Sequence, residues 1–269
     1  MDKRTFREKT EEFSKNLHVD FVKKILVFDN LQSTNSSAKD LARTGAEEGT
    51  IVLARTQSQG RGRFDRIWQS PEGGVYLSII LRPKISLQYT SLLPLVAALA
   101  VVKSIRSYGL PATIKWPNDV RVNGKKVAGI LLESEISGDH ITYVIVGIGI
   151  NLNTNLQKLP REIRSHSTSL LSEIGAPIAY HDFIRSLFRQ FDEVYKWFNE
   201  GNSIKIIGEW KTSTDTLGRF IRVQTSTELL QGTAFDIDQK GFLLLRTDQG
   251  EIKKILSGDC LYFEELDHT

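Results

Sequence analysis

The segment over residues 57–68 has the side chains best suited to chemistry in this sequence. It reads Gln-Ser-Gln-Gly-Arg-Gly-Arg-Phe-Asp-Arg-Ile-Trp, with three arginines within six positions. Gly60 and Gly62 let the backbone approach a ligand closely, and guanidinium and main-chain N–H groups bind carboxylate or phosphate oxygens. Two aromatic rings, Phe64 and Trp68, favour a loop that folds over a ligand, and a solvated basic hairpin tip is the alternative. The segment therefore predicts a site where Arg61, Arg63 and Arg66 bind an anion.

A second polar segment, residues 115–119, reads Lys-Trp-Pro-Asn-Asp. We expect a strand to end at the proline and to leave an amide and a carboxylate exposed at the edge of the sheet. Asp119 is therefore a candidate ligand for Mg²⁺. Because Pro-Asn-Asp is also common in plain turns, turn chemistry is the alternative.

Small residues in the predicted strand over residues 126–133 mark a place where another group approaches the backbone. Ala128 and Gly129 follow Lys126, which we expect to face the same side as Ala128. This direction would bring the lysine ammonium to the wall of a ligand site. A hairpin-edge lysine surrounded by water is the alternative.

A second pair of glycines lies in the sequence Gly147-Ile148-Gly149-Ile150-Asn151. Residues two apart share one face of a strand, so Gly147 and Gly149 leave that face bare and Asn151 lies on it. The dinucleotide fingerprint fails here, because Leu152 stands where a third glycine is needed and no helical pattern follows.

Other familiar catalytic motifs are absent from the sequence. There is no Gly-x-x-x-x-Gly-Lys-Ser/Thr phosphate loop and no Gly-x-Ser-x-Gly elbow, and Cys260 is the single cysteine. The five histidines are scattered, which argues against a structural zinc site. The chemistry that remains is catalysis by positioning and charge neutralisation, such as attack on a phosphorus atom.

Composition and charge describe a globular protein with one large and one small domain. The chain has 269 residues, 40% of them hydrophobic, and a formal net charge of +3. Residues 218–269 hold 6 basic and 9 acidic side chains against 29 and 23 in the rest, so we expect an anionic ligand on the larger part. The longest apolar stretch, residues 92–102, is too short to span a membrane, and residues 1–9 lack the apolar core of a secretory signal. We therefore expect a cytoplasmic protein without a membrane segment.

The elements that must position these residues follow from hydrophobic periodicity. Ser33 and its neighbours can cap a helix that ends at Gly45, a long apolar helix follows from Ser91 to about Tyr108, and residues 181–200 have helical spacing. The pair Asn123-Gly124 predicts a hairpin. The pattern indicates an α+β fold with helices packed on a mixed, mainly antiparallel sheet, with strands at residues 25–28, 50–54, 75–81, 113–116, 120–122, 126–133 and 141–150.

The sequence changes character after Leu217-Gly218. Short alternating runs separated by glycine or aspartate turns predict strands at residues 220–224, 231–237, 242–246, 252–256 and 261–263. Five short strands in this length suggest a small β-barrel of the SH3-like kind. We therefore expect a catalytic domain over residues 1–217 and a C-terminal SH3-like domain over residues 218–269.

Five motifs, taken in order, resemble the biotin–protein ligase family over about residues 25–265. Each motif alone is weak, but five at matching spacing are specific. The resemblance implies a catalytic domain related to class II aminoacyl-tRNA synthetases and lipoate ligases, followed by an SH3-like domain, which agrees with the patterns above. The motifs are Ser33-Thr34-Asn35, Gln57 to Trp68 with its Gly-Arg-Gly-Arg, Lys115 to Asp119, Lys126-Val127-Ala128-Gly129-Ile130-Leu131 and Gly147 to Asn151.

The resemblance implies an enzyme that uses ATP, biotin and Mg²⁺. In that family the carboxylate of biotin attacks the α-phosphorus of ATP, which gives biotinyl-5′-adenylate and pyrophosphate. A lysine of a biotin carboxyl carrier domain then takes the biotin as an amide. Both reactants of the first step are anions, so fixed positive charge and Mg²⁺ must offset their repulsion.

By the same resemblance, the catalytic residues are Lys126, Arg63 and Arg61. We expect Lys126 and Arg63 beside the biotin carboxylate and the α-phosphate, while Arg61 orders the loop and holds phosphate. We expect Trp68 to close over the adenylate, with a core tryptophan as the alternative, and Asn151 to read the adenine edge. The other binding positions are Ser33, Thr34 and Gln57 at the ureido ring of biotin, then Asn35, Gly60, Gly62, Gly129, Gly147 and Gly149, with Asp119 as the metal candidate.

The sequence departs from the family in two places. The loop ends in Phe64-Asp65-Arg66, where many relatives have more arginine or glycine, so Asp65 is expected to weaken the grip on phosphate. In the C-terminal domain no residue matches a family position that contacts ATP.

The expected partner is the biotin carboxyl carrier protein or domain of a biotin-dependent carboxylase. Many relatives carry an N-terminal helix-turn-helix domain, but only 24 residues precede the first expected strand, so we expect no DNA binding. A homodimer is an open possibility, through exposed edge strands such as residues 141–150.

Two other functions compete with the ligase. An enzyme of the same fold could adenylate lipoate or another acyl acid, and a non-enzymatic regulator could keep only the pocket. The Gly-Arg-Gly-Arg loop and the Lys126 to Gly129 strand disfavour the first. The lack of a DNA-binding domain and the negative tail disfavour the second.

Overall fold

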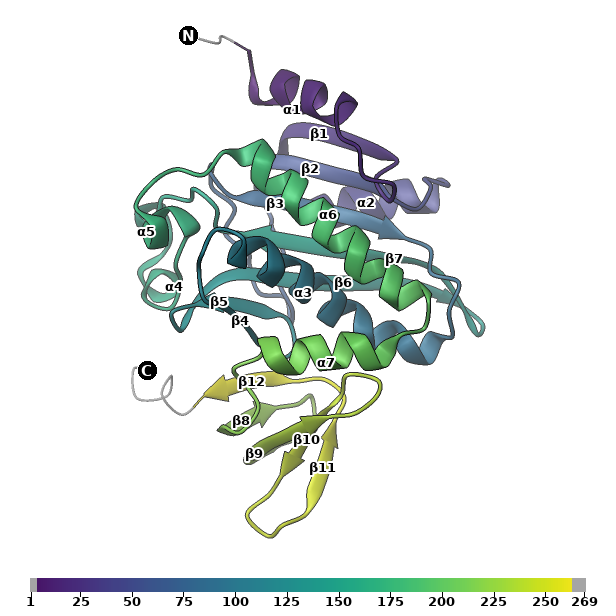
Figure 1. The fold of residues 1–269 in the computed structure, drawn as a ribbon, viewed down its shortest axis with the longest axis vertical. Helices are drawn as coiled ribbons and strands as arrows, with labels where there is room; N and C mark the ends of the chain where they lie inside the picture. The colour runs from purple at the N-terminus through teal and green to yellow at the C-terminus, as the bar shows by residue number, and fades with distance from the viewer. Residues whose placement is uncertain (1–3, 263–269) are drawn as a thin grey trace.

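Seven strands form the sheet that organises the larger part of the chain (Figure 1). They are β1 (Lys24–Leu31), β2 (Thr50–Gln57), β3 (Val75–Leu81), β4 (Ala112–Lys115), β5 (Asp119–Val122), β6 (Lys125–Ser137) and β7 (His140–Ile150). In the computed structural model, which describes residues 4–262, their order in the sheet is β1-β2-β3-β7-β6-β5-β4. The β1 and β2 strands pair in parallel and the other neighbours pair antiparallel. The expected mixed, mainly antiparallel sheet is confirmed.

Three helices pack together on one side of this sheet (Figure 1): α3 (Leu93–Arg106), α6 (Tyr180–Asn199) and α7 (Ser203–Ser213). The α3 helix is apolar on nearly every side because it lies within the core, and Pro94 falls in its first turn, where a missing N–H costs little. The apolar stretch was expected to be too short to span a membrane, but together with the 3-10 helix η1 (Leu87–Leu92) it forms a helical stretch of 20 residues, Leu87–Arg106. Among residues 4–262 this is the one stretch that is long and apolar enough to cross a membrane, by length and composition only. The most apolar 18 residues of this stretch are 67% buried inside the protein, as expected of a core helix.

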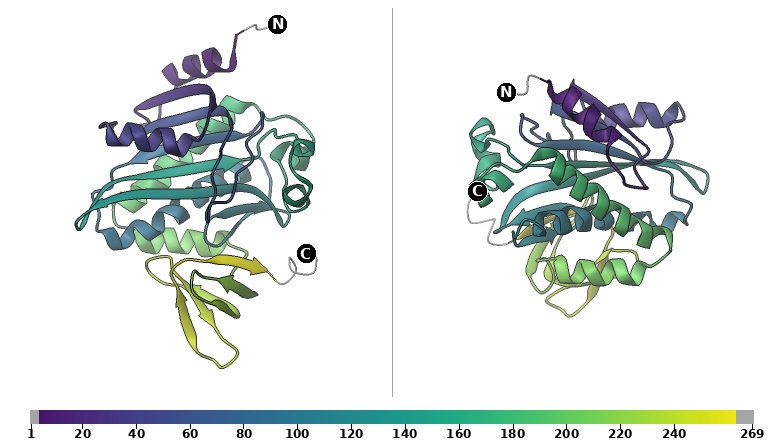
Figure 2. Two further views of the ribbon diagram at one scale, coloured as in Figure 1. Left: turned by 180° about the vertical axis from the view of Figure 1, so that it is seen from behind. Right: turned by 45° about the horizontal axis from the view of Figure 1, so that its top comes forward.

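The opposite face of the sheet carries α2 (Thr34–Arg43), as the view from behind shows (Figure 2). Ala38 and Ala42 bring this helix close to the sheet, where it forms a second, smaller apolar cluster with Val52, Ile80 and Ile145. The remaining helical elements are α1 (Phe6–Lys15), beside β1, and a short series between β7 and α6: η2 (Leu156–Lys158), α4 (Arg161–Ser165) and α5 (Leu170–Ile174). Because α2 is only ten residues long, it leaves part of this face of the sheet uncovered.

Five further strands form a separate antiparallel sheet that lies below α7 in Figure 1. They are β8 (Phe220–Gln224), β9 (Leu229–Ile237), β10 (Leu243–Arg246), β11 (Ile252–Ile255) and β12 (Asp259–Tyr262), in the order β11-β10-β9-β8-β12. The expected C-terminal β domain is present, although Phe263 of its last expected strand lies outside the described residues. It contacts the larger part through Trp116, whose indole N–H donates to Gly241 O at 3.3 Å.

The local patterns located most elements within a few residues, and the Asn123-Gly124 hairpin has the positive φ angles that such a turn requires, +49° and +77°. One expectation about assembly is wrong. The strand over residues 141–150 is not an edge strand, because β7 is paired with β3 on one side and β6 on the other. The edges of the sheet are β1 and β4.

The burial of α3 leads to a stability prediction. Leu99 is fully buried in this helix, whereas Ile204, at the start of α7, is 82% exposed. We expect Leu99→Ala to lower the free energy of unfolding by about 3 kcal/mol, because lost burial and a residual cavity add. Ile204→Ala should change it by less than about 0.5 kcal/mol. Urea unfolding followed by circular dichroism measures both; equal effects would contradict the core position of α3.

Candidate functional site

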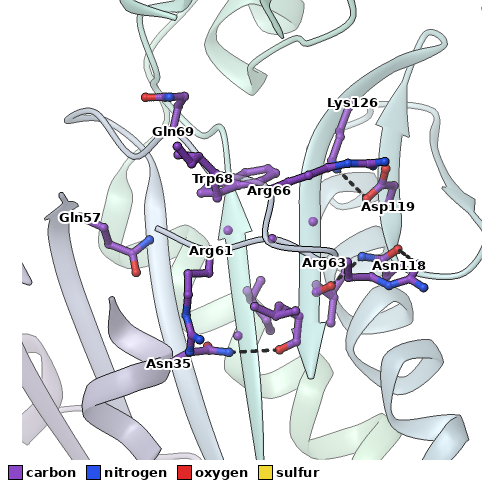
Figure 3. Close-up of a pocket in the computed structure, with 18 of the residues that line it drawn as sticks. Asn35, Gln57, Arg61, Arg63, Arg66, Trp68, Gln69, Asn118, Asp119 and Lys126 are labelled. Atoms are coloured by element: carbon purple, nitrogen blue, oxygen red, sulfur yellow. Dashed lines mark hydrogen bonds and ion pairs between the residues drawn. The ribbon is translucent and has the colours of Figure 1, made fainter. Parts of the chain in front are cut away.

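A cavity of about 660 Å³ opens on the face of the sheet that carries α2. Residues 57–69 cross over it as a loop, which we call the lid (Figure 3). Gly60 alone among the residues expected at the site does not line the cavity; it lies at the base of the lid, where a Cβ would be 2.7 Å from Ser70 Oγ. The expected residues that do line it are Ser33, Thr34, Asn35, Gln57, Arg61, Gly62, Arg63, Trp68, Asp119, Lys126, Gly129, Gly147, Gly149 and Asn151.

Two paired glycines form the floor beneath Trp68. Gly129 of β6 is directly opposite Gly149 of β7. A Cβ on Gly149 would lie 2.6 Å from Trp68 Cε2, and one on Gly129 would lie 3.0 Å from Trp68 Cζ3, so the indole ring rests on both bare positions. The indole nitrogen is buried without a hydrogen-bond partner. A buried N–H of this kind is costly, and an acceptor on a ligand would relieve it.

A third glycine, Gly147 of β7, makes room for the side-chain amide of Asn35. A Cβ on Gly147 would collide with Asn35 Oδ1. Gly147 and Gly149 therefore present one bare face to the site, as their spacing predicts, but different groups approach them. Asn35 lies over the first and Trp68 over the second.

Polar groups converge at the N-terminus of α2. Ser33, Thr34 and Asn35 are each 4% exposed, and the Ser33 hydroxyl makes no capping bond to the helix although it lines the cavity. Thr34 N donates to Gln57 Oε1 at 2.8 Å, and Gln57 Nε2 donates to Ser70 Oγ at 2.9 Å. The orientation of the Gln57 amide is thus fixed by contacts on both of its ends. Such a set of buried, oriented polar atoms can recognise a ring that carries N–H donors and a carbonyl.

The lid is a tight hairpin. Trp68 N donates to Gly60 O at 2.9 Å and Gly62 N donates to Arg66 O at 2.7 Å. At its tip Phe64 and Asp65 have φ of 54° and 55°, the left-handed region that non-glycine residues rarely adopt. The Phe64 ring is 53% exposed, so only Trp68 of the two aromatic side chains folds onto the sheet.

Each lid arginine has a partner within the protein. Arg61 Nη2 is 2.7 Å from Glu133 Oε2. Arg63 donates at 3.1 Å to Asn118 Oδ1, and at the same distance to Ser257 Oγ and Gly258 O of the C-terminal domain. Arg66 forms an ion pair with Asp259 of that domain. The lid is therefore held by both parts of the chain.

The environment of Arg63 favours an anion. Burial lowers the pKa of its guanidinium, and the nearby carboxylates of Asp259 and Asp119 act in the opposite direction. The group stays charged because arginine does not deprotonate in proteins. A half-buried guanidinium has lost part of its hydration, so an anionic ligand that pairs with it would stabilise it.

Lys126 points into the cavity, but for a reason that the sequence did not reveal. Val120 pairs with Ala128, while the next residue of β5 pairs with Lys126, so Val127 is an extra residue that forms a β-bulge. The bulge turns Lys126 to the face of Gly129, whose added Cβ would lie 3.4 Å from Lys126 Cε. Ala128 is fully buried in the core on the other face. The expectation that Lys126 and Ala128 share a face is therefore wrong.

The ammonium group of Lys126 lies between a carboxylate and an aromatic ring (Figure 3). Its Nζ is 2.7 Å from Asp119 Oδ1 and 5.3 Å from the centroid of the Trp68 ring. The backbone of Lys126 is held in turn by the segment after α4, because its N–H donates to His166 O and its carbonyl accepts from Thr168 N. Asn151 is tied to the same segment through Nδ2, which donates to Thr168 O at 3.1 Å.

Several residues of the site were not found from the sequence. Ser78 of β3 donates to Asn35 Oδ1 at 2.6 Å, and Glu133 of β6 accepts from both Asn35 and Arg61. Residues 257–259, where the chain enters β12, contact the lid, although no sequence pattern marks them. A serine inside a buried strand is the one local signal, because a buried hydroxyl needs a partner.

Residues 27–151 match the model of the Biotin/lipoate A/B protein ligase family, and residues 216–261 match the Biotin protein ligase C terminal domain. The chain is 41% identical to the Bifunctional ligase/repressor BirA of Bacillus subtilis, covering 87% of this chain and 73% of that protein. It is 36% identical to the biotin–acetyl-CoA-carboxylase ligase of Paracoccus denitrificans, with 81% and 92% covered.

Solved structures are similar as well. The biotin protein ligase from Aquifex aeolicus in complex with biotin and ATP superimposes with a TM-score of 0.76 and 32% identity. The superposition covers 88% of this chain and 97% of that one. Both domains of this chain therefore have counterparts of known structure.

The contact between the glycine floor and Trp68 leads to a prediction. We expect Gly149→Ala to push the indole off β7 and to raise hydrogen-exchange rates at residues 60–68, because the added methyl overlaps the ring. Gly208→Ala is the control, since a Cβ there meets nothing within 4 Å. Exchange measured by mass spectrometry on the ligand-free protein tests this, and identical lid exchange in both variants would be evidence against the contact.

Proposed function

The chain belongs to the biotin protein ligase family, and we propose that its cationic, glycine-lined cavity carries out that family's two reactions. The carboxylate of biotin attacks the α-phosphorus of ATP, so that biotinyl-5′-adenylate forms and pyrophosphate leaves. The amine of a lysine on a biotin carboxyl carrier protein then attacks the carbonyl of the adenylate, which releases AMP and leaves biotin as an amide. One observation supports this assignment above others: Lys126 and the lid arginines, from separate elements, converge over one bare stretch of sheet.

Lys126 is the central cation of the proposal. Its ammonium lines the cavity beside the glycine floor, and a bulge holds its backbone in that direction. Biotin and ATP are both anions, and their repulsion in a partly dehydrated site is far stronger than in water. Lys126 can exchange Asp119 for a substrate oxygen at little cost, because one charged contact replaces another. In the second step the same ammonium stabilises charge on the leaving phosphate oxygen.

The lid arginines complete the positive charge. Arg63 is assigned beside the carboxylate and the α-phosphate, and Arg61 to ordering the lid and holding phosphate. Both assignments are supported by their position on the cavity wall. The hydrogen bonds of Arg63 to residues 257 and 258 mean that its approach to substrate involves the C-terminal domain.

The polar cluster at the start of α2 is assigned to the ureido ring of biotin. That ring has two N–H donors and a carbonyl, and each group left unpaired in a dry pocket costs about 1–3 kcal/mol. The hydroxyls of Ser33 and Thr34 are buried, the amide of Gln57 is half-buried, and all three residues line the cavity. At the other end we assign Asn151 to the adenine edge and Trp68 to the cover of the adenylate.

Mg²⁺ is the expected metal partner of ATP. Among residues 4–262 no group of three His, Cys, Asp or Glu side chains is arranged to hold a metal ion. Mg²⁺ does not need such a group, because it is usually held by substrate phosphates together with one or two protein carboxylates. Asp119 is the candidate for that contact, and the ion when bound would supply further charge neutralisation.

We also propose an acceptor and a location for the reaction. The acceptor is the carrier protein or domain of a biotin-dependent carboxylase, and the reaction takes place in the cytoplasm. We propose no DNA binding by residues 4–23, because they contain one helix, α1, whereas a helix-turn-helix motif needs two. If a homodimer forms by strand pairing, it uses β1 or β4 rather than β7.

Incubation of the protein with biotin, Mg-ATP and a biotin carrier domain tests the proposed function. Mass spectrometry should show one added biotin on a single lysine of the acceptor. The same assay with lipoate separates this function from that of a lipoate ligase of related fold. Transfer of lipoate without transfer of biotin would overturn the proposal.

The role of Lys126 leads to a specific prediction. Lys126→Ala should lower the rate of adenylate formation by a factor of roughly 10² to 10³, the loss typical of a preorganised charge that contacts the transition state. Lys125→Ala, at the neighbouring exposed position of β6, is the matched control and should keep its rate. Pyrophosphate release measures both. An unchanged rate in Lys126→Ala would contradict the assigned role.

The composition of the lid predicts that ligands order it. We expect hydrogen exchange at residues 57–68 to slow when biotin and ATP, or the adenylate, are added, because the glycines and arginines gain contacts. Exchange in the buried helix α3 should not change and serves as the internal control. If the hydrogen-exchange rates at residues 57–68 stay the same at saturating ligand, the ligands do not order the lid.

A further inference from the structure

Glu133 joins two parts of the site without lining the cavity itself. Its Oε2 atom accepts a hydrogen bond from Asn35 Nδ2 at 2.9 Å and is 2.7 Å from Arg61 Nη2. Asn35 belongs to the polar cluster at the start of α2, and Arg61 belongs to the lid. Figure 3 shows Asn35 and Arg61 close together on one side of the cavity. A single carboxylate oxygen therefore connects the ureido end of the proposed site to the element that covers it.

The carboxylate fixes the orientation of the Asn35 amide. An asparagine amide can present either its oxygen or its NH₂ group on a given side, and only NH₂ can donate to a carboxylate. With Nδ2 turned to Glu133, Oδ1 faces Ser78, whose hydroxyl donates to it at 2.6 Å. Ser78 Oγ is also 2.8 Å from Thr34 Oγ1, a residue of the same cluster. Glu133 thus sets the direction of a chain of hydrogen bonds that ends at ligand-facing groups.

Fold stability does not account for a carboxylate at this place. The side chains of Arg61 and Glu133 are 44% and 23% exposed, and ion pairs with this much solvent contribute little to stability. A negative charge behind a site for two anions also opposes binding, unless the contacts that it organises outweigh the repulsion. The position of Glu133 is therefore better explained by orientation of its two partners.

We infer that Glu133 is a positioning residue that couples biotin recognition to lid closure. It holds the Asn35 amide in the orientation that the polar cluster needs, and it holds Arg61 so that the lid closes against the same cluster. The inference rests on the proposed function, since it assigns this end of the cavity to biotin. Its structural part, the tethering of the lid, does not depend on the identity of the ligand.

The variant Glu133→Ala tests the coupling, with Glu135→Ala as the matched control. Glu135 is two residues further along β6 and forms its own ion pair, with Arg43 at 3.1 Å, away from the cavity. We expect Glu133→Ala to raise the KM for biotin about tenfold or more, the loss expected of one hydrogen bond to a charged group, while kcat changes less. Glu135→Ala should leave KM unchanged, although it also removes the acceptor of the buried Tyr143 hydroxyl at 2.7 Å and should therefore lower the thermal midpoint. The thermal midpoint of Glu133→Ala should match that of the parent protein.

Glu133→Gln is the conservative variant. Its side-chain oxygen can accept the same two hydrogen bonds, so it should restore most of the KM, which a loss of folding or of bulk charge would not allow. A KM for biotin in Glu133→Ala equal to that of Glu135→Ala would overturn the inference. So would a Glu133→Gln variant as impaired as Glu133→Ala.

Hydrogen exchange of the ligand-free protein separates this inference from the proposed function. Glu133→Ala should speed exchange at residues 60–68 relative to Glu135→Ala, because Arg61 loses its tether. If the parent protein transfers no biotin, the proposed function fails whatever the lid does. If biotin is transferred but neither lid exchange nor the KM responds to Glu133→Ala, the coupling alone is wrong.

Discussion

Biotin and ATP are both anions, and their electrostatic repulsion must be offset before they can react in this site. In water the repulsion between unit charges at contact is modest, but it grows severalfold in a site that excludes solvent. Positive charge must therefore be placed before the substrates arrive. The fold supplies it from two directions, with Lys126 rising from β6 and the arginines of the lid above it. No covalent nucleophile is needed for such a reaction, and none is suggested by the sequence.

The neighbouring features follow from this requirement. Free cations packed close together would repel one another, and in the structure each has an acidic or carbonyl partner, such as Asp119, Glu133 or Asp259. Because Gly129 and Gly149 have no side chains, the Trp68 ring lies directly on the sheet. This contact brings the lid close to the sheet at one side of the cavity. Because the partners of the lid come from both domains, its position depends on how the C-terminal domain packs against the sheet.

The sequence predicted what local periodicity controls. The strand positions, the bare face of Gly147 and Gly149, and the Asn-Gly hairpin all depend on residues a few positions apart. Lys126 was correctly expected at the wall of the site, but the expectation that it shares a face with Ala128 was wrong, because the bulge at Val127 exists only in the pairing of β6 with β5. Glu133 was missed for a similar reason. Its partners are about a hundred and about seventy residues away in the chain, and a glutamate in the outer half of a strand is typical of a solvated position.

The proposed charge neutralisation requires the Lys126 ammonium to contact both substrates when they are bound. A crystal structure of the protein with biotin and a non-hydrolysable ATP analogue measures this. We predict that Lys126 Nζ leaves Asp119 and lies within about 3 Å of both a biotin carboxylate oxygen and an α-phosphate oxygen. A lysine still paired with Asp119, with both substrate anions bound elsewhere, would contradict it.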